Sequence, residues 1–580
     1  MSRGVQVTPR AQHERWLGDP SAPTPQLAVF FREPVSRLRH GLSPFLLSER
    51  GLRSDRAAGE RIVASGRRDA ASAHGTLTLQ GEPRSRLQND SVETWSRSAY
   101  VQPVNEARLA TLDEGARRPT VVIAGATGFI GSALAPRLCE RYRLIGLSRS
   151  AGLQLAGVET VRQVDLFSRK NTEAALKGAD IAVYLVHSMM PSARLVQAHF
   201  SDLDLLCADN FARAARSQGV RHIVYVSGLI PQQAELSEHL RSRLEVEHVL
   251  AGYGVPVTTL RAGIVVGAGG SSFQILSRLV HRLPMMVCPS WTGTKTQAVH
   301  LDGLLAVLEA VIDEAAPVTH TYDVAGTRSI SYQELMSTMA RVLNVRRLML
   351  PVPFVTPRLS GLWVSMTTGA PMSLVAPLVE SLRHEMVARE DNAVRHPAEQ
   401  TIEVDAMLQG ALHQQSEAAS SAPKAFRGLR KRPGPPTVVS VQRMELPPGR
   451  DSVWAADEYL SWLPRGLGWL VPIRVVSVGE QVEFRVLQRG PVLLRLERRK
   501  TDDPEKRRVF RVLGGLLARQ TERGRLEFRE VLDGRTLLVG LHEFCPRLPW
   551  WIYRFTQAVF HAWVMKRFAK HLRRTPGLEA

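Results

Sequence analysis

The sequence predicts an α/β fold with a doubly wound parallel sheet, followed by a smaller α+β domain and preceded by a disordered N-terminal extension. Three observations support this prediction. Short apolar runs alternate with helix-patterned segments after Pro119, which is typical of strand–helix units. A glycine-rich turn separates the first apolar run from its helix. The 580 residues also exceed the roughly 250–300 at which single cores stop growing, so more than one domain is expected.

Composition narrows the class of protein. The chain has 75 Lys and Arg against 55 Asp and Glu, a net charge of +20, but the arginines are scattered and match no nucleic-acid-binding motif. We therefore expect no nucleic-acid partner. Neither a disulfide framework nor a metal site is predicted, because the four cysteines are widely spaced: Cys139, Cys207, Cys288 and Cys545. With no signal peptide or long apolar span, we expect a cytoplasmic location, and peripheral contact with the inner membrane stays open.

Changes in amino-acid composition along the chain divide it into four parts. Residues 1–117 read as a disordered extension rich in Arg and Ser, to which we assign no function. Residues 118–415 form the α/β domain, and the polar, basic and Pro-rich residues 416–436 form a linker. The α+β domain occupies residues 437–574.

The elements of the α/β domain follow from its apolar periodicity. After the first strand, which ends at about Ile123, a helix is expected from Ser132. Five more strands are expected at 143–149, 161–166, 180–188, 221–228 and 256–267. The later segment 322–343 suggests a strand and a helix that cap a substrate cleft.

The turn after the first strand carries the strongest functional signal. Gly125, Gly128 and Gly131 are spaced three apart between a strand and a helix. Such glycines permit a tight turn, let the backbone approach a pyrophosphate and allow close helix–strand packing, while the helix N-terminus presents unpaired N–H groups to the anion. The predicted cofactor-binding residues here are Gly125, Thr127, Gly128, Phe129, Ile130 and Gly131. The structural alternative is a turn in an α/β domain without a ligand.

The ends of the next two strands bear on the type of dinucleotide. The second strand ends in Ser148 and Arg149, with no carboxylate to hold the ribose diol of NAD. A guanidinium there favours the extra phosphate of NADP, although NAD stays an alternative and Arg149 could be a solvated surface residue. Asp165 and Leu166 end the third strand, where they could meet the adenine edge, or Asp165 could cap the next helix.

Several motifs carry a family resemblance: "GATGFIG", "SRS", "VDL", "YLVHSM", "IVYVSGL" and "RAGIVVGAGGSSF". Together they resemble the atypical, extended short-chain dehydrogenase/reductases, close to NmrA-like and NAD(P)H-binding epimerase/dehydratase-type proteins. The resemblance covers residues 119–412. It implies a Rossmann-type domain with the cofactor over the carboxyl edge of the sheet, and a Ser, a Tyr and a Lys as the catalytic residues.

The catalytic pattern is only partly present. Ser227 matches the Ser, but His239 occupies the Tyr position and Arg243 the Lys position. His239 could act as an acid/base near neutral pH or be a surface histidine, and Arg243 could anchor a ribose, phosphate or carboxylate. His187 closes the fourth strand, where the resemblance implies contact with the nicotinamide-side ribose; a core histidine is the alternative.

The C-terminal part resembles the START-like helix-grip (SRPBCC) superfamily in its element order. Strands are expected at 437–447, 481–490, 491–501, 508–519 and within 524–544, with helices at 451–465 and 550–572. This resemblance implies a cup for an apolar ligand; a packing helix that fills a core is the alternative.

Three functions are consistent with these features. The first is an NADP-dependent oxidoreductase or epimerase/dehydratase acting on a hydrophobic or carbonyl-bearing small molecule. The second is a non-catalytic NADP(H)-binding sensor or scaffold that lacks the Tyr-x-x-x-Lys pair. The third, supported by less, is a lipid-handling protein at a membrane surface. The sequence does not specify an oligomeric state.

Overall fold

The computed structural model describes residues 117–187, 195–232, 235–353, 356–394, 402–419, 437–467, 472–487, 489–500 and 506–578. Nearly all of the predicted N-terminal extension, and most of the predicted linker, lie outside these ranges. The predicted domain limits therefore stay predictions. The described residues, 117–578 with the gaps given above, belong to one compact unit.

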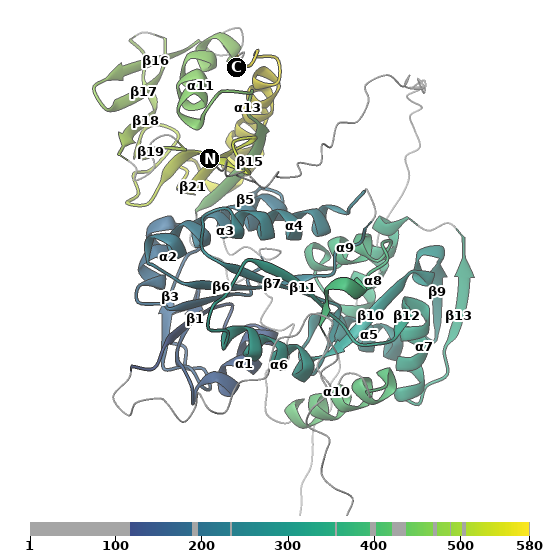
Figure 1. Ribbon diagram of the computed structural model, residues 1–580. Helices are drawn as coiled ribbons and strands as arrows, with labels where there is room; N and C mark the ends of the chain where they lie inside the picture. The colour runs from purple at the N-terminus through teal and green to yellow at the C-terminus, as the bar shows by residue number, and fades with distance from the viewer. Residues whose placement is uncertain are drawn as a thin grey trace, which may run out of the picture. The chain divides into compact units, whose positions relative to one another are not determined.

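An eight-stranded sheet dominates the first part of this unit, with strand order β14-β11-β7-β6-β4-β1-β2-β3 (Figure 1). Every neighbouring pair is parallel. Its strands are β1 (Thr120–Ala124), β2 (Arg143–Ser148), β3 (Thr160–Gln163), β4 (Ile181–Tyr184), β6 (His222–Gly228), β7 (Val257–Ala262), β11 (His320–Val324) and β14 (Ala393–Val394). The predicted Rossmann-type sheet is confirmed, and its strand order reverses between β1 and β4, the position at which such sheets bind ligands.

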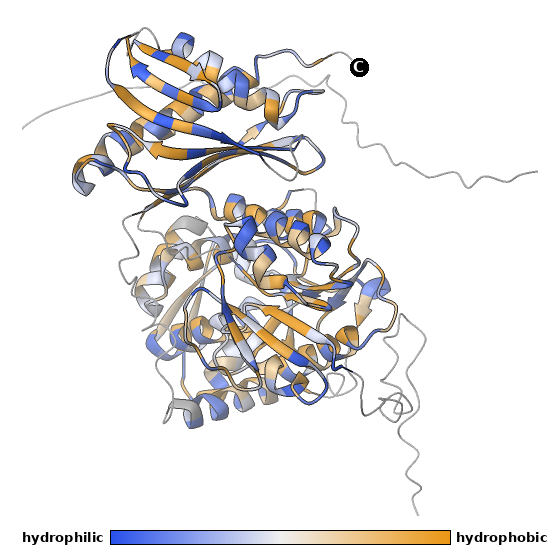
Figure 2. Cartoon of the chain, turned by 90° about the vertical axis from the view of Figure 1, so that its left-hand side faces the viewer, coloured by the Kyte–Doolittle hydropathy of each residue, from blue (hydrophilic) through white to orange (hydrophobic). Residues whose placement is uncertain are grey.

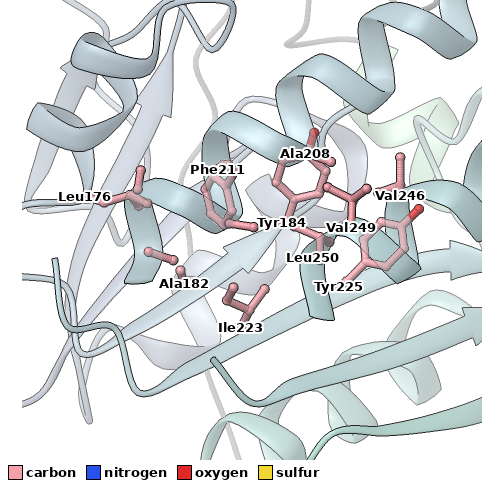
Figure 3. Close-up of a cluster of buried hydrophobic side chains, with 14 of the residues drawn as sticks. Leu176, Ala182, Tyr184, Ala208, Phe211, Ile223, Tyr225, Val246, Val249 and Leu250 are labelled. Atoms are coloured by element: carbon pink, nitrogen blue, oxygen red, sulfur yellow. The ribbon is translucent and has the colours of Figure 1, made fainter. Parts of the chain in front are cut away.

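Helices cover both faces of the sheet. On one face α1 (Phe129–Leu138) and α6 (Leu301–Ile312) pack in a core that includes Val121, Ile123 and Val183. On the other lie α2 (Arg169–Leu176), α3 (Phe200–Ser217) and α4 (Glu238–Ala251). Figure 3 shows this second core, in which Tyr184 of β4 packs against Phe211 of α3 and against Tyr225 of the adjacent strand β6. Because both faces are covered, the strands are buried and read as continuous apolar runs.

The predicted sixth strand, 256–267, divides into two strands of different sheets. β7 ends at Ala262, and β8 (Ile264–Val266) joins a small sheet of order β12-β10-β8. Gly263 lies between them, where an added Cβ would come within 2.3 Å of the Gln297 carbonyl oxygen. Only glycine fits this close backbone approach, so the chain can change sheets there.

A subdomain extends beyond the carboxyl edge of the large sheet. It comprises α5 (Ser271–Arg282), β9 (Met285–Pro289), β10 (Lys295–His300), β12 (Ser329–Ser331), α7 (Tyr332–Val342), β13 (Leu348–Val352), α8 (Pro357–Thr368), α9 (Met372–Ser381) and α10 (Val404–Ala419). The strand and helix expected within 322–343 are present as β11, β12 and α7.

The C-terminal part is an antiparallel sheet with helices. Its order is β16-β17-β18-β19-β20-β21-β15, and its strands are β15 (Val438–Glu445), β16 (Ile473–Val478), β17 (Gln481–Val486), β18 (Val492–Arg499), β19 (Arg507–Gly514), β20 (Arg525–Val531) and β21 (Thr536–Phe544). Hydrophobic and hydrophilic residues alternate along these strands (Figure 2). This is an α+β region, as predicted, while its START-like assignment stays a prediction.

Two of its elements differ from expectation. β16 had no prediction, and the single C-terminal helix is broken into α12 (Trp550–Phe555) and α13 (Gln557–Leu572). The break falls at Thr556, whose φ of −119° and ψ of −82° are not helical. The expected core helix α11 (Ser452–Leu467) is present, and Tyr459 packs edge-on against Phe568 of α13.

The two parts share a sheet and a buried ionic contact. β5 (Leu195–Gln197) pairs in parallel with β15 and so extends the C-terminal sheet. Arg529 of β20, 1% exposed, donates to Asp209 of α3 at 2.5 Å and to the Asn210 amide oxygen at 2.6 Å. Although burial raises the pKa of Asp209, Arg529 and Arg213 hold it below its usual value. The C-terminal part is therefore fixed to the helix that also lines the candidate site.

Candidate functional site

The glycine turn follows β1 at the switch point of the sheet. Gly125 has a φ of +95°, a conformation that favours glycine, and a Cβ there would lie 3.0 Å from the Leu185 carbonyl oxygen. A Cβ on Gly131 would lie 2.4 Å from the Gly125 carbonyl oxygen. The first and third glycines are thus required by the fold of the turn itself, and they bring α1 close against β1.

The N-terminus of α1 is open to an anion. Its first intrahelical hydrogen bond runs from the Ser132 N–H to the Gly128 carbonyl at 2.9 Å. The amides of Phe129, Ile130 and Gly131 therefore have no partner within the helix, and its first turn holds no acidic residue. Thr127 and Gly128 are exposed beside them. This cradle fits a dinucleotide pyrophosphate, with the backbone N–H groups as donors.

The strand ends predicted to meet the adenosine lie along the same edge. Ser148 is buried, and its hydroxyl accepts from the Ser150 N–H at 3.0 Å, whereas Arg149 is exposed. Asp165 accepts from the Phe167 N–H at 3.1 Å, so its carboxylate stabilises the turn before α2. The Leu166 carbonyl accepts from the Asn210 side chain at 2.7 Å. Of this group, Arg149 is the exposed cation that a 2′-phosphate could reach.

A buried cluster of polar residues lies at the ends of β4 and α4. The Asp204 carboxylate of α3 is 3.0 Å from His187 Nδ1 and also pairs with the Arg243 guanidinium of α4. Arg243 is 5% exposed. Burial lowers the pKa of His187, and the Arg243 charge lowers it further. Because Arg243 is buried against Asp204, it positions His187 instead of presenting a free cation to a ligand.

His239 continues this cluster toward the subdomain. Its ring stacks on His187 with centroids 5.3 Å apart, and its Nδ1 is 3.1 Å from the Ser381 hydroxyl of α9. Ser381 donates its proton to the Pro377 carbonyl at 2.9 Å, so its oxygen accepts from the other neighbours. With this direction of the Ser381 hydroxyl, we assign the His239 proton to Nδ1, which leaves a lone pair on Nε2.

Burial lowers the pKa of His239 to about 3, with further contributions from His187 and Arg243. The imidazole is therefore neutral at physiological pH. The acid/base role near neutral pH that the sequence suggested does not fit this environment. A neutral imidazole with a free Nε2 can accept a hydrogen bond but has no proton to donate there.

A cavity of about 720 Å³ separates the large sheet from the subdomain. It reaches Phe129 and Ile130 of α1 at one side and His239 of α4 at another. Most of its wall is apolar, including Phe273, Ile275, Leu276, Leu279, Met336, Trp363, Val364 and Leu378. Ser227 is not among the described lining residues, although the next residue, Gly228, is. The structure thus joins the glycine turn and His239 through one cavity, and it separates Ser227 from it.

Comparison with known proteins agrees with this geometry. A family model described as NAD(P)H-binding matches residues 125–276. This segment is an NAD(P)H-binding domain. Its cofactor is NAD(P), as predicted, because the matched segment begins at the first glycine of the turn and includes the cradle.

A curated relative matches part of the chain. Auxiliary protein GraX of Staphylococcus aureus (strain NCTC 8325 / PS 47) is 33% identical over 146 residues, which cover 24% of this chain and 43% of the relative. The matched segment thus spans less than half of that relative.

Solved structures also resemble part of the chain. A UDP-glucose 4-epimerase of Thermotoga maritima is 12% identical with a TM-score of 0.39, and the match covers 52% of this chain and 99% of that one. A nucleoside-diphosphate-sugar epimerase of Staphylococcus aureus is 16% identical with a TM-score of 0.40, covering 50% and 99%. WbmG of Bordetella bronchiseptica, in complex with NAD, is 14% identical with a TM-score of 0.39, covering 53% and 96%. At these values we transfer no substrate to this chain.

Two residues of the polar cluster around His187 and His239 were not predicted from the sequence as site residues. Asp204 lies in a helix whose apolar pattern gives no sign of a buried carboxylate, and Ser381 ends a helix far along the chain. Arg243 occupies the Lys position of the family pattern, and a buried Arg needs an anionic partner. The Arg at this position was therefore the signal that could have pointed to a nearby carboxylate such as Asp204. No feature of the sequence pointed to Ser381.

Proposed function

We propose that this protein is an NADP(H)-dependent oxidoreductase that acts on an uncharged, largely apolar small molecule. The observation that supports it is the cavity, which has an apolar wall and reaches both the N-terminus of α1 and His239. Ligand sites of this kind are mostly apolar with a few polar groups that fix orientation. Preference for NADP rests on Arg149, the exposed guanidinium at the end of β2.

The composition of the wall bears on substrate class. Among the described residues that line the cavity there is no Lys, Arg, Asp or Glu. A diphosphate there would be buried without a cation, which costs several kcal/mol or more. The cavity therefore disfavours an epimerase or dehydratase reaction on a nucleotide-linked sugar. An uncharged alcohol, ketone, aldehyde or quinone meets no such penalty.

Polar atoms at separate places in the wall can orient such a molecule. The Trp291 indole N–H and the Ser360 hydroxyl are buried, and neither has a hydrogen-bond partner among the described residues. Buried polar atoms are normally satisfied, so these two favour a ligand with an oxygen atom. Tyr332 also lines the cavity, and burial raises its pKa to about 12, so its phenol is protonated.

The chemistry divides between cofactor and protein. NADPH, when bound, supplies a hydride. Reduction of a carbonyl also consumes a proton, for which the protonated Tyr332 phenol in the cavity wall is the donor that the chain offers. The chain further contributes an apolar wall that excludes water, and a neutral His239 whose Nε2 accepts a hydrogen bond from a hydroxyl group. His187, Asp204 and Arg243 hold that imidazole in place through stacking and pairing.

A second function is favoured by the same cluster. A pKa of about 3 makes His239 a weak base, and Arg243 is engaged by Asp204. Efficient proton transfer needs a group with a pKa near the working pH. These facts favour a protein that binds NADP(H) and an apolar ligand without turnover, as a sensor or scaffold.

Two measurements test these proposals. Calorimetric titration with NADPH and NADH measures the cofactor preference, and we expect NADPH to bind more tightly. Nicotinamide absorbance is then followed with a panel of uncharged apolar carbonyl compounds, alcohols and quinones. Turnover that Leu276→Trp suppresses by filling the cavity, without loss of NADPH affinity, supports the enzyme. Binding of NADPH and of an apolar probe without any turnover supports the sensor. Absence of binding by either nucleotide would contradict both.

A further inference from the structure

Helix α8 presents an apolar stripe to solvent. Leu359, Leu362 and Met366 are 59%, 50% and 77% exposed. Their spacing of three and four residues places them on one face of the helix. On the opposite face Ser360 and Val364 are buried and line the cavity. The helix is thus apolar on both faces, and the described residues cover only one of them.

A second apolar surface comes from the β9–β13 ribbon, which precedes α8 in the chain. Leu348 is paired with Met285, and Leu350 with Val287. All four side chains are exposed, while Met286 and Cys288 between them are buried. The alternation along β9 therefore turns an apolar face of the ribbon outward. We call these four residues, together with Leu359, Leu362 and Met366, the apolar surface.

Each of the two parts of the apolar surface borders the cavity through one residue. Val287 of the ribbon and Leu359 of α8 are exposed to solvent and also line the cavity wall. β13 ends at Val352 and α8 starts at Pro357, so the ribbon and the helix follow each other closely in the chain. An apolar ligand that enters beside these residues would pass from the surface to the cavity without crossing a charged rim of described residues.

The chain segments that carry this surface contain cations and no acidic residue. From Val342 to Val379 the sequence contains Arg346, Arg347 and Arg358 but no Asp or Glu, and residues 271–294 contain Arg278 and Arg282 and again no acidic residue. Arg282 donates to the Thr367 carbonyl at 2.6 Å, which places its guanidinium at the C-terminal end of α8. Cations that border an exposed apolar face complement an anionic lipid surface.

We propose that the apolar surface docks onto an anionic lipid bilayer and that the cavity takes its ligand from the lipid phase. The second half of this proposal rests on the proposed apolar ligand of the cavity. Docking is interfacial: no helix among the described residues is long and apolar enough to cross a membrane. Insertion of the apolar side chains and attraction of the arginines to anionic head groups act together.

Flotation of the full-length protein with vesicles tests the docking. Vesicles of phosphatidylglycerol and phosphatidylcholine are compared with vesicles of phosphatidylcholine alone. We expect wild type to float with the anionic vesicles, and the double variant Leu362→Asp, Met366→Asp to bind them at least roughly tenfold more weakly. Neither residue lines the cavity. Val478→Asp is the matched control, because Val478 is 73% exposed on β16, and it should float like wild type. Arg346→Glu should weaken binding most at low salt.

The outcomes separate the two proposals. Failure of wild type to float, or unchanged flotation of the double variant, would overturn the docking. So would a loss of flotation with Phe555→Asp alone, because Phe555 is an exposed residue of α12 outside the apolar surface. A double variant that floats normally but changes the oligomeric state in solution would identify the surface as a contact between copies of this chain instead.

NADPH affinity and the unfolding midpoint are measured in the same preparations. Vesicle binding without NADPH binding would leave the docking intact and contradict the proposed function. NADPH binding without vesicle binding would contradict the docking and leave the proposed function intact. For the lipid route, vesicles that contain an uncharged fluorescent apolar probe should lose it to wild type but not to Leu276→Trp, which docks with its cavity filled. Equal transfer to both proteins would overturn the route.

Discussion

The imidazoles of His187 and His239 stack with their planes 14° apart, although the two residues lie on different elements of the fold. Burial lowers the pKa of both. Two neutral rings can stack at this distance, whereas two protonated rings would repel each other. The stack therefore depends on both histidines remaining neutral, and it fixes the side of His239 that meets the cavity.

His239→Ala should weaken binding of a hydroxyl-bearing apolar ligand by about tenfold, since one hydrogen bond to the ligand is lost. Because the pKa of His239 is about 3, this residue does not titrate between pH 5 and 8. Wild type and His239→Ala should therefore show the same pH dependence of ligand binding and of turnover in this range. Titration at several pH values in wild type and variant checks this. An inflection near pH 6.5 that disappears in His239→Ala would contradict the neutral role.

Arg149→Ala should reduce NADPH affinity by roughly tenfold and leave NADH affinity unchanged, because only NADPH carries the 2′-phosphate with which a guanidinium pairs. Calorimetry with both nucleotides measures the two affinities. Arg143→Ala, at the opposite end of the same strand, is the control and should change neither. Equal losses for NADPH and NADH would indicate that Arg149 acts on the fold instead.

Gly131→Ala should lower the affinity for both nucleotides and the free energy of unfolding. The new methyl group would lie 2.4 Å from the Gly125 carbonyl oxygen, and such overpacking costs about 1–3 kcal/mol. Gly410→Ala is the matched control: it lies in α10 with nothing within 4 Å of the added Cβ, so it should stabilise by up to about 1 kcal/mol. Urea unfolding and NADPH titration measure both effects.

Stability should decrease in mild acid because of His222. This residue is 1% exposed at the start of β6, and burial lowers its pKa to about 4. Between pH 6.5 and 4 the unfolded chain binds a proton there that the folded chain does not, so the free energy of unfolding falls as the pH falls, by about 2–3 kcal/mol for this group. Below pH 4 both states are protonated and this contribution is constant. Urea unfolding of wild type and His222→Gln across this range should show a smaller decrease in the variant.

Arg529→Met should destabilise the protein by about 3–5 kcal/mol, because it leaves the carboxylates of Asp209 and Glu527 buried without this partner. Arg495→Met removes an exposed ion pair with Glu483 and should cost less than about 1 kcal/mol. Chemical unfolding compares the two. A small effect of Arg529→Met would contradict a structural role for this contact between α3 and β20.

The sequence alone determined the parallel sheet, the glycine turn and the cofactor class. These features are local: Val121–Ile123 forms a buried apolar run, Gly125 has a φ of +95°, and a Cβ on Gly131 would meet the backbone of Gly125, six residues earlier. The break at Thr556 escaped prediction because the apolar pattern continues through it. The division of the predicted strand 256–267 at Gly263 also escaped prediction, since it depends on the carbonyl of Gln297 in another strand.

Tertiary structure decided what the site can do. The pairing of Arg243 with Asp204 and of His239 with Ser381 brings together residues 39 and 142 positions apart. Neither helical nor strand periodicity specifies which distant side chains meet, because that depends on how α3, α4 and α9 pack. The apolar cavity arises from the same packing, so the charge state of His239 and the polarity of its surroundings could be known only once these helices were in place.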